Sequence, residues 1–157
     1  MKKLFITAAI ATMFSVTAFA DGGKKPSTEA SEKNVTLAAL NQFKSDFKSA
    51  DNVLWTVTPS CQKVSFVDNN IDYTAFYNLS GDYLGVTQNV AYTTLAASVR
   101  TKIAKNYQGY KVSDVIKYDT RNIEEPVVYF VDVKNATSEI VLKVTDDNNI
   151  SYFKRVK

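Results

Sequence analysis

Residues 52–90 read NVLWTVTPSCQKVSFVDNNIDYTAFYNLSGDYLGVTQNV, and this stretch decides the fold. It holds four runs that are rich in aromatic and β-branched residues, a composition typical of β-strands. The runs are Asn52–Thr58, Cys61–Val67, Ile71–Leu79 and Tyr83–Val90. Short polar or glycine-containing segments separate them, and such segments form tight turns. Because parallel neighbours need a connection of about a dozen residues or more, we expect four antiparallel strands.

The third of these runs is apolar on both of its sides. Successive side chains of a strand point to opposite faces, so the odd-numbered residues of Ile71–Leu79 share one face and Phe76 lies on the other. Tyr73 and Tyr77 belong to the odd-numbered set. Such a strand is either central in a covered sheet or presents an apolar surface to a partner.

An amphipathic helix is predicted directly before these strands. Thr36 can cap its first turn. Apolar residues then recur at steps of three and four, which places them along one helix face: Leu37, Leu40, Phe43, Phe47 and Ala50.

The same order of elements recurs in the second half of the chain. Thr94 can cap a second helix, whose apolar stripe comprises Leu95, Val99, Ile103 and Tyr107. Four strand-like runs follow, at Lys111–Asp119, Val127–Lys134, Glu139–Thr145 and Ile150–Val156. The sequence therefore predicts an α+β fold, a tandem repeat of a helix plus a four-stranded antiparallel unit, with the helices packed on one face of the sheet. The repeats span about 36–91 and 92–157.

The first 20 residues have the features of a secretory signal peptide. Lys2 and Lys3 precede an apolar run, which ends at Ala18 and Ala20 in an A-x-A arrangement. Residues 21–35 are polar and have the composition of a flexible tether. We therefore expect export to the periplasm with cleavage before Asp21, no membrane span after cleavage, and a single domain over residues 36–157.

The composition argues against several classes of function. Removal of residues 1–20 leaves 17 basic and 16 acidic residues, a balance that does not favour nucleic-acid binding. The chain has no histidine and five scattered glycines, so neither the common catalytic triads nor a phosphate-binding loop can form. We therefore expect no cofactor, no metal site and no enzymatic activity. The single cysteine, Cys61, is expected to be buried, with intermolecular pairing as the alternative.

Weaker chemical possibilities remain in the acidic residues. Asp72 with Asp82, or Glu124 with Glu125, could act as paired carboxylates in a hydrolase, although all four lie in or beside predicted turns and hairpins. Residues 146–149 (DDNN) are rich in oxygen ligands, but they lack the alternating spacing of a calcium loop. A hairpin turn is the expected structure there.

The pattern resembles the PepSY-like, β-lactamase-inhibitor-protein-like periplasmic proteins of Gram-negative bacteria. The likeness covers roughly residues 36–156 and rests on apolar and aromatic spacing: Phe47-x-x-Ala50-Asp51-Asn52-Val53-x-Trp55, Tyr73-x-Ala75-Phe76-Tyr77-Asn78-x-x-Gly81-Asp82, and the helix from Leu95 to Tyr107 with Tyr110 beyond it. Here Leu95-Ala96 stands where such proteins usually carry Leu-Pro. The resemblance implies a tandem repeat whose sheet has a curved, partly exposed face.

The sequence thus favours a non-catalytic binding module that contacts a protein or peptide through an aromatic-rich sheet face. A small-molecule carrier and, behind it, a carboxylate-based envelope hydrolase are the alternatives. Tyrosine and tryptophan dominate the hot spots of binding surfaces. The candidate contact residues are Trp55, Tyr73, Tyr77, Tyr118, Tyr129 and Tyr152. The other interpretation is that most of these aromatic side chains fill the core.

Overall fold

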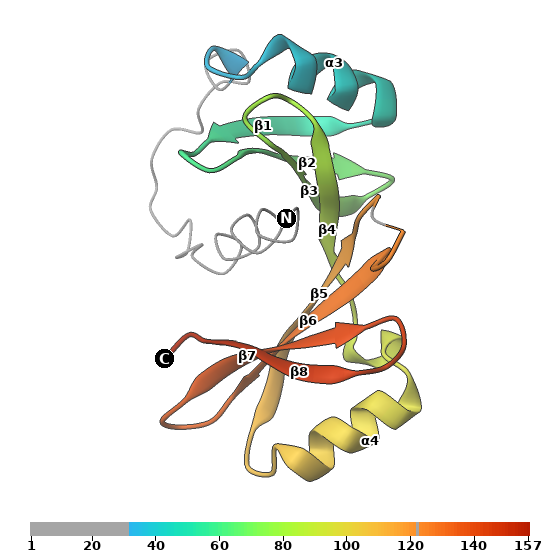
Figure 1. Cartoon of the computed structure of the whole chain (residues 1–157), viewed down its shortest axis with the longest axis vertical. Coiled ribbons are helices and arrows are strands. Elements are labelled where there is room, and N and C mark those ends of the chain that lie inside the picture. The colour runs from blue at the N-terminus through green and yellow to red at the C-terminus, as the bar shows by residue number, and fades with distance from the viewer. Residues whose placement is uncertain (1–31, 122) are drawn as a thin grey trace. The chain divides into compact units, whose positions relative to one another are not determined.

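The computed structural model describes residues 32–121 and 123–157 (Figure 1). The predicted signal peptide and most of the predicted tether lie outside these residues. No helix among the described residues is long and apolar enough to cross a membrane. The first group of elements is α3 (Leu37–Asp46), β1 (Asp51–Val57), β2 (Gln62–Asp68), β3 (Ile71–Tyr77) and β4 (Tyr83–Asn89). The second group is the 3-10 helix η2 (Tyr92–Thr94), α4 (Ala97–Asn106), β5 (Lys111–Asp119), β6 (Val127–Lys134), β7 (Glu139–Thr145) and β8 (Ile150–Arg155).

The strands form one eight-stranded antiparallel sheet in chain order, from β1 to β8. A helix precedes each group of four strands, so the predicted fold class and tandem repeat are confirmed. The contacts divide the chain into two compact units, which we call unit 1 (the described residues up to Val86) and unit 2 (Thr87–Lys157). Each unit has its own hydrophobic core.

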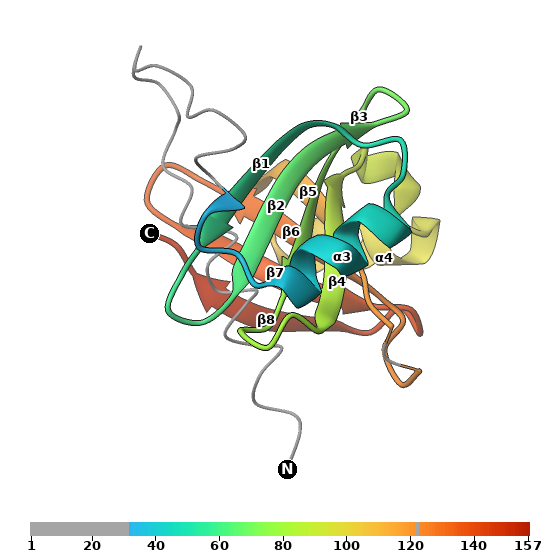
Figure 2. The ribbon, with the colours of Figure 1, turned by 90° about the horizontal axis from the view of Figure 1, so that it is seen from above.

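The core of unit 1 is a cluster of aromatic rings from α3 and the sheet. Figures 1 and 2 show α3 lying against the strands of this unit. Phe43 of α3 packs edge-on against Trp55 and Phe66, with ring centroids 5.5 and 5.1 Å apart. Tyr77 continues the cluster at 5.5 Å from Trp55. The predicted alternation in β3 is confirmed, because Tyr73, Ala75 and Tyr77 all belong to this cluster, whereas Phe76 does not.

Helix α3 differs from its prediction at both ends of the apolar stripe. Thr36 caps it as expected, since its Oγ1 accepts a hydrogen bond from Ala39 N at 3.3 Å. Leu37 is 71% exposed, and Ala39 is buried in its place. The helix ends at Asp46 with Phe47 as its C-cap, so Ala50 packs against the core from beyond the helix.

A buried amide joins the N-terminus of α3 to the sheet. Gln62, the first residue of β2, is 1% exposed. Its Oε1 accepts from Thr36 N at 2.7 Å, and its Nε2 donates to Thr36 Oγ1 at 3.0 Å and to Asn78 O at 2.7 Å. This network satisfies every group of the buried amide except one lone pair and ties together the helix start, β2 and the turn after β3.

In unit 2, the register of the strands creates three rows of side chains beneath α4. The middle row is Val115, Val131, Leu142 and Tyr152 across β5 to β8. One flanking row is Lys117, Tyr129, Val144 and Ile150, and the other begins with Val112, Val133 and Ile140. Val99 and Ile103 of α4 pack against this face. The opposite face carries Tyr118, Val128 and Phe130, as period-two alternation requires.

The predicted capping of the second helix by Thr94 is wrong. Thr94 belongs to η2, and its N–H bonds to Ala91 O at 2.9 Å. Leu95 and Ala96 are extended, with ψ near 145°, so α4 begins only at Ala97. Ala96 is the N-cap and has no side chain that can accept from the first turn.

The other local predictions can be compared directly with the structure. Cys61 is fully buried, as expected. Residues 146–149 form the predicted hairpin turn, in which the Asp147 carboxylate accepts hydrogen bonds from the Thr145 hydroxyl and from Asn149 N. Asn148 adopts a left-handed φ of 62°, which asparagine tolerates.

Two glycines with positive φ provide a matched test of the contact between α3 and the β3–β4 turn. A Cβ on Gly81 (φ +96°) would lie 2.6 Å from Ala38 Cβ and 2.8 Å from Ala39 N, whereas one on Gly109 (φ +82°) would meet nothing within 4 Å. Gly109→Ala should therefore cost only the left-handed strain of about 1 kcal/mol. Gly81→Ala adds overpacking and should lower the free energy of unfolding by about 2–4 kcal/mol in urea titrations. Equal losses in the two variants would contradict this close contact.

Candidate binding site around helix α4

Three of the six predicted contact residues lie in the aromatic cluster of unit 1. Trp55 and Tyr77 are 3% and 0% exposed, and Tyr73 is half-buried with its ring stacked on Phe66 at 5.6 Å. All three are on the face that α3 covers. A partner could reach Trp55 and Tyr77 only if this core opened.

The other three predicted residues lie in unit 2 and differ in accessibility. Tyr118 is 1% exposed and faces away from α4. Tyr129 is half-buried on the α4 side, and Tyr152 of the last strand is 60% exposed. The six aromatic side chains therefore do not share one accessible face, and Tyr129 and Tyr152 are the most accessible on the α4 side. A role of any of the six in partner binding stays a prediction.

Tyr129 lines a groove at the N-terminal end of α4, which we call the α4 groove. Its volume is about 410 Å³. The helix side is formed by the segment that leads into α4, and the sheet side by β5, β6, β7 and the turn after β7. The lining residues are Thr94, Leu95, Ala96, Val99, Lys117, Val127, Tyr129, Val144, Thr145, Asp146 and Asn148.

The corresponding place in unit 1 is closed. There the helix N-cap is Thr36, and the first residue of the second strand is Gln62. The turn after the third strand carries Gly81, which has no room for a Cβ beside Ala38 and Ala39 of α3. In unit 2 the N-cap is Ala96 and the first residue of the second strand is Val127. Neither side chain can form the hydrogen bonds that Gln62 makes with Thr36. Equivalent positions of the two units thus differ: the space is filled in unit 1 and open in unit 2.

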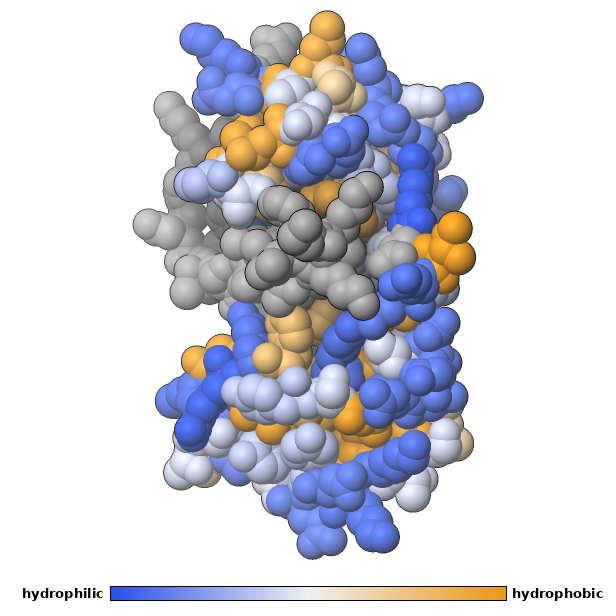
Figure 3. Space-filling model, viewed as in Figure 1, coloured by the Kyte–Doolittle hydropathy of each residue, from blue (hydrophilic) through white to orange (hydrophobic). Residues whose placement is uncertain are grey.

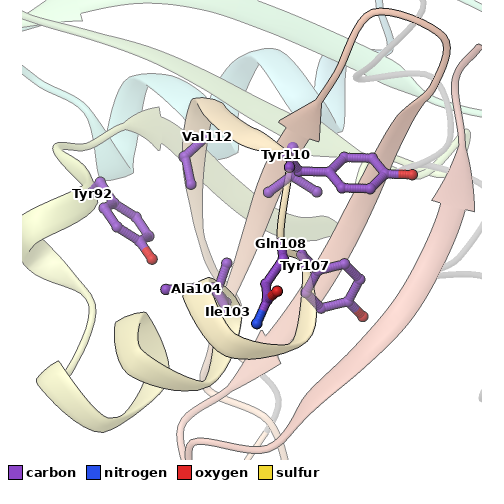
Figure 4. Close-up of a pocket in the computed structure, with 9 residues that line it drawn as sticks. Tyr92, Ile103, Ala104, Tyr107, Gln108, Tyr110 and Val112 are labelled. Atoms are coloured by element: carbon purple, nitrogen blue, oxygen red, sulfur yellow. The ribbon is translucent and has the colours of Figure 1, made fainter.

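A second hollow, of about 260 Å³, lies at the C-terminal end of α4, and we call it the tyrosine pocket (Figure 4). Tyr92 approaches it from one side, and Tyr107 and Tyr110 lie on the other. The rings of Tyr107 and Tyr110 are nearly perpendicular, with centroids 6.3 Å apart. Tyr92 is held by a hydrogen bond from its hydroxyl to Arg100 O at 3.2 Å, and burial raises its pKa above the usual value.

The floor of the tyrosine pocket belongs to the core of unit 2. Ile103, Val112 and Val133 line it, and the exposed residues Ala104 and Gln108 form part of its mouth. Figure 3 shows hydrophobic atoms at the surface of the lower part of the view, where Figure 1 labels β8 and α4. The two hollows thus flank a helix whose underlying core reaches the surface.

Sequence reasoning missed most of this site. Tyr107 was expected on the helix stripe and Tyr110 entered only through the family resemblance, while nothing marked Tyr92. The pocket depends on Gly109, whose positive φ turns the chain from α4 into β5. A glycine directly after an apolar helical stripe was the available signal.

Five of the eleven residues that line the α4 groove are polar or charged: Thr94, Lys117, Thr145, Asp146 and Asn148. Lys117 Nζ pairs with Asp119 Oδ2 at 2.9 Å, and Asp146 and Thr145 lie at the hairpin side. The groove therefore combines an apolar floor with a polar rim, which is the usual anatomy of a protein or peptide contact.

The carboxylates proposed for hydrolysis are not assembled into a site within either unit. Asp72 is exposed at the start of β3, whereas Asp82 lies beyond the other end of that strand and accepts from Asn78 Nδ2 at 2.7 Å. In unit 2, Glu125 accepts both hydrogen bonds from Lys143 Nζ, at 2.8 and 2.9 Å. Glu124 and Glu125 are neighbours on the exposed loop between β5 and β6.

A different acidic pair lies on the face of unit 2 opposite α4. Asp132 of β6 and Glu139 of β7 are diagonal neighbours across the strands. Burial, a hydrogen bond with Glu139 and the charge of Glu139 raise the pKa of Asp132 to about 6, while Ser113 and Lys134 partly oppose the shift. Asp132 Oδ1 is buried and has no hydrogen-bond partner among the described residues. Alternation in β6 was the signal that could have revealed this pair.

The acidic pair makes stability depend on pH in a direction that can be tested. Because the pKa of Asp132 is higher in the folded state than its ordinary 3.8, the folded state binds more protons between about pH 4 and 6. The free energy of unfolding should fall as pH rises through this window and should not fall further above it. Asp132→Asn should remove this decline, as followed by urea unfolding at several pH values. A difference between the two proteins that stays constant across the window would contradict the raised pKa.

Comparisons with known proteins agree at the level of the fold. No protein-family model matches the sequence, and no curated protein matches it significantly. Solved structures do match. A BLIP-like protein from Bacteroides fragilis is 14% identical, with a TM-score of 0.66 over 78% of this chain and 86% of that one.

Two further structures are similar to the same extent. A DUF2874 family protein from Bacteroides uniformis is 16% identical, with a TM-score of 0.69 over 78% of this chain and 90% of that one. A candidate periplasmic protein from Bacteroides eggerthii is 11% identical, with a TM-score of 0.68 over 78% and 89%. The chain therefore has the fold of the BLIP-like and DUF2874 proteins, which is the fold that the resemblance in its sequence implied.

Proposed function

We propose that this protein is a non-catalytic binding module of the periplasm, and that it takes a protein or peptide partner on the α4 side of unit 2. The observation that carries this proposal is the α4 groove. It occupies a position that the other repeat closes with a helix cap, a buried amide and a tight turn. Two of these features are absent from unit 2, where Ala96 is the N-cap and Val127 is the first residue of the second strand.

The side chains at the two hollows support a macromolecular partner. Tyr129 lines the α4 groove, and Tyr92, Tyr107 and Tyr110 line the tyrosine pocket. Tyrosine offers a large contact area and a polar tip at a small cost in side-chain entropy, and it is enriched among binding hot spots.

Export to the periplasm is supported by two independent observations. Residues 1–20 have the charge, the apolar run and the A-x-A end of a signal peptide. One of the proteins that share the fold is a candidate periplasmic protein. A balanced mature charge of 17 basic and 16 acidic residues supports a partner other than nucleic acid.

A small-molecule carrier is the second candidate, and the size of the α4 groove favours it. Pockets for small molecules commonly measure about 300–1,000 Å³, and the groove measures about 410 Å³. Such a carrier would retain a small ligand through mild purification, and native mass spectrometry would detect it as an added mass.

Filling the α4 groove should abolish partner capture. Ala96 and Ala97 are adjacent and both exposed, but only Ala96 lines the groove. Ala96→Trp should remove a captured envelope protein from an affinity pull-down, because the indole occupies the space of the partner's side chain. Ala97→Trp is the matched control and should capture the partner as well as the parent protein does.

Folding is checked for both variants by thermal unfolding, and neither should change the midpoint by more than a few degrees. Equal capture by Ala96→Trp, Ala97→Trp and the parent protein would exclude the groove as the contact surface. Turnover of a substrate by the purified protein, abolished by neutralising one carboxylate, would exclude a non-catalytic role.

A further inference from the structure

We infer that the outer edge of β8 accepts an extended, acidic segment of a partner protein as an additional antiparallel strand. This inference concerns a surface separate from the α4 groove and goes beyond the proposed function. It rests on the position of β8 in the repeat, on the sign of the charge along it, and on the side chains that it exposes.

The two units differ in what lies beside their fourth strand. β4 and β8 are the fourth strands of the two units. In the sheet order β4 is followed by β5, whereas β8 is the last strand and pairs only with β7 among the described residues. The edge of a strand presents unpaired N–H and C=O groups, which another extended chain can bind. The sheet therefore continues beyond β4, whereas β8 has no strand on its other side among the described residues; its register with β7 shifts between Tyr152 and Lys154.

The positive charge along this edge favours a partner segment that is acidic. Residues 148–157 include Lys154, Arg155 and Lys157 and no acidic residue. Arg155 and Lys157 form no ion pair among the described residues; Arg155 instead donates to Lys157 O at 2.9 Å and to Ser138 Oγ at 3.5 Å. Charges on an edge strand prevent pairing with a like-charged copy of the same strand. With all three charges positive, the same edge attracts a strand that carries glutamate or aspartate.

The exposed side chains offer cross-strand contacts to the added segment. Tyr152 is 60% exposed and Val156 is 43% exposed. Aromatic and β-branched residues form the favourable side-chain pairs between neighbouring strands. A partner segment with alternating acidic and β-branched residues would thus meet the cations and apolar side chains of β8 and of Val156 and Lys157, the two residues that follow it.

The test uses a blocked heptapeptide of alternating glutamate and threonine, titrated into the isotope-labelled protein and followed by nuclear magnetic resonance. We expect changes in chemical shift only for residues of β8 and for residues next to it. We also expect slower hydrogen exchange at the β8 amides that point away from β7. The alternating lysine and threonine peptide should bind at least tenfold more weakly. The glutamate peptide methylated at every backbone nitrogen should also bind at least tenfold more weakly, because it cannot donate to the edge.

Charge reversal provides a matched pair of variants. Lys154→Glu/Lys157→Glu should reverse the preference and bind the lysine peptide. Lys102→Glu/Lys105→Glu makes the same change in net charge on the exposed side of α4 and should keep the preference for glutamate. Thermal unfolding confirms that both variants fold.

Three outcomes would overturn the inference. The first is that the chemical-shift changes fall outside β8, and the second is that the methylated glutamate peptide binds as tightly as the unmethylated one. The third is that β8 chemical shifts change with protein concentration in the absence of peptide, which would identify a second copy of the chain as the occupant. The result is separate from that for the α4 groove, because Ala96→Trp should bind the glutamate peptide as the parent protein does.

Discussion

The length and width of α4 limit how much of the sheet in unit 2 can be covered. A helix of ten residues is about 15 Å long and about 10 Å wide. Four strands about 4.8 Å apart extend about 14 Å between the outer strand axes. Val99 and Ile103 pack over Val115, Val131 and Leu142 of the middle row, whereas Tyr152 in the same row is 60% exposed. The rows at either end of the helix line the two hollows. The α4 groove and the tyrosine pocket are the two places where this coverage ends.

In unit 1, the helix is also short, but other groups cover the part of the sheet beside its N-terminal end. Its N-terminal helix end is sealed by the Gln62 amide, which bonds to Thr36 and Asn78, and by the turn at Gly81. Its core is filled by aromatic rings from four strands and α3. Both units have the same order of elements, so the differences at equivalent positions identify where their surfaces differ while the fold is the same.

The fold could be predicted from sequence because its signals are local and repeated. Turn residues such as Ser80-Gly81-Asp82 and the alternation in β3 fixed the strands, and their observed ends differ from the expected ones by at most two residues. Alternation alone does not say which face a helix will cover. Trp55 and Tyr77 were therefore candidates for binding, with the core as the favoured interpretation for each residue alone, and the structure places them in the core of unit 1.

The α4 groove could not be predicted because it arises where two separate segments lack the polar side chains that fill the equivalent place in unit 1. Ala96 in place of a capping residue and Val127 in place of an amide carry no positive signal, and an apparent cap at Thr94 pointed to the wrong helix start. The tyrosine pocket likewise joins η2, α4 and β5, whose proximity is a property of the tertiary structure. Sites of this kind become visible only when the two repeats are compared in three dimensions.

The central claim is that the partner lies against α4 of unit 2. Site-specific photo-crosslinking in living cells tests it most directly, with benzoylphenylalanine placed singly at positions 96, 97 and 104. The account predicts that positions 96 and 104, which line the two hollows, form crosslinks to a discrete envelope protein, and that position 97 does not. Crosslinks of equal yield from position 97, or none from positions 96 and 104 in a folded protein, would contradict it.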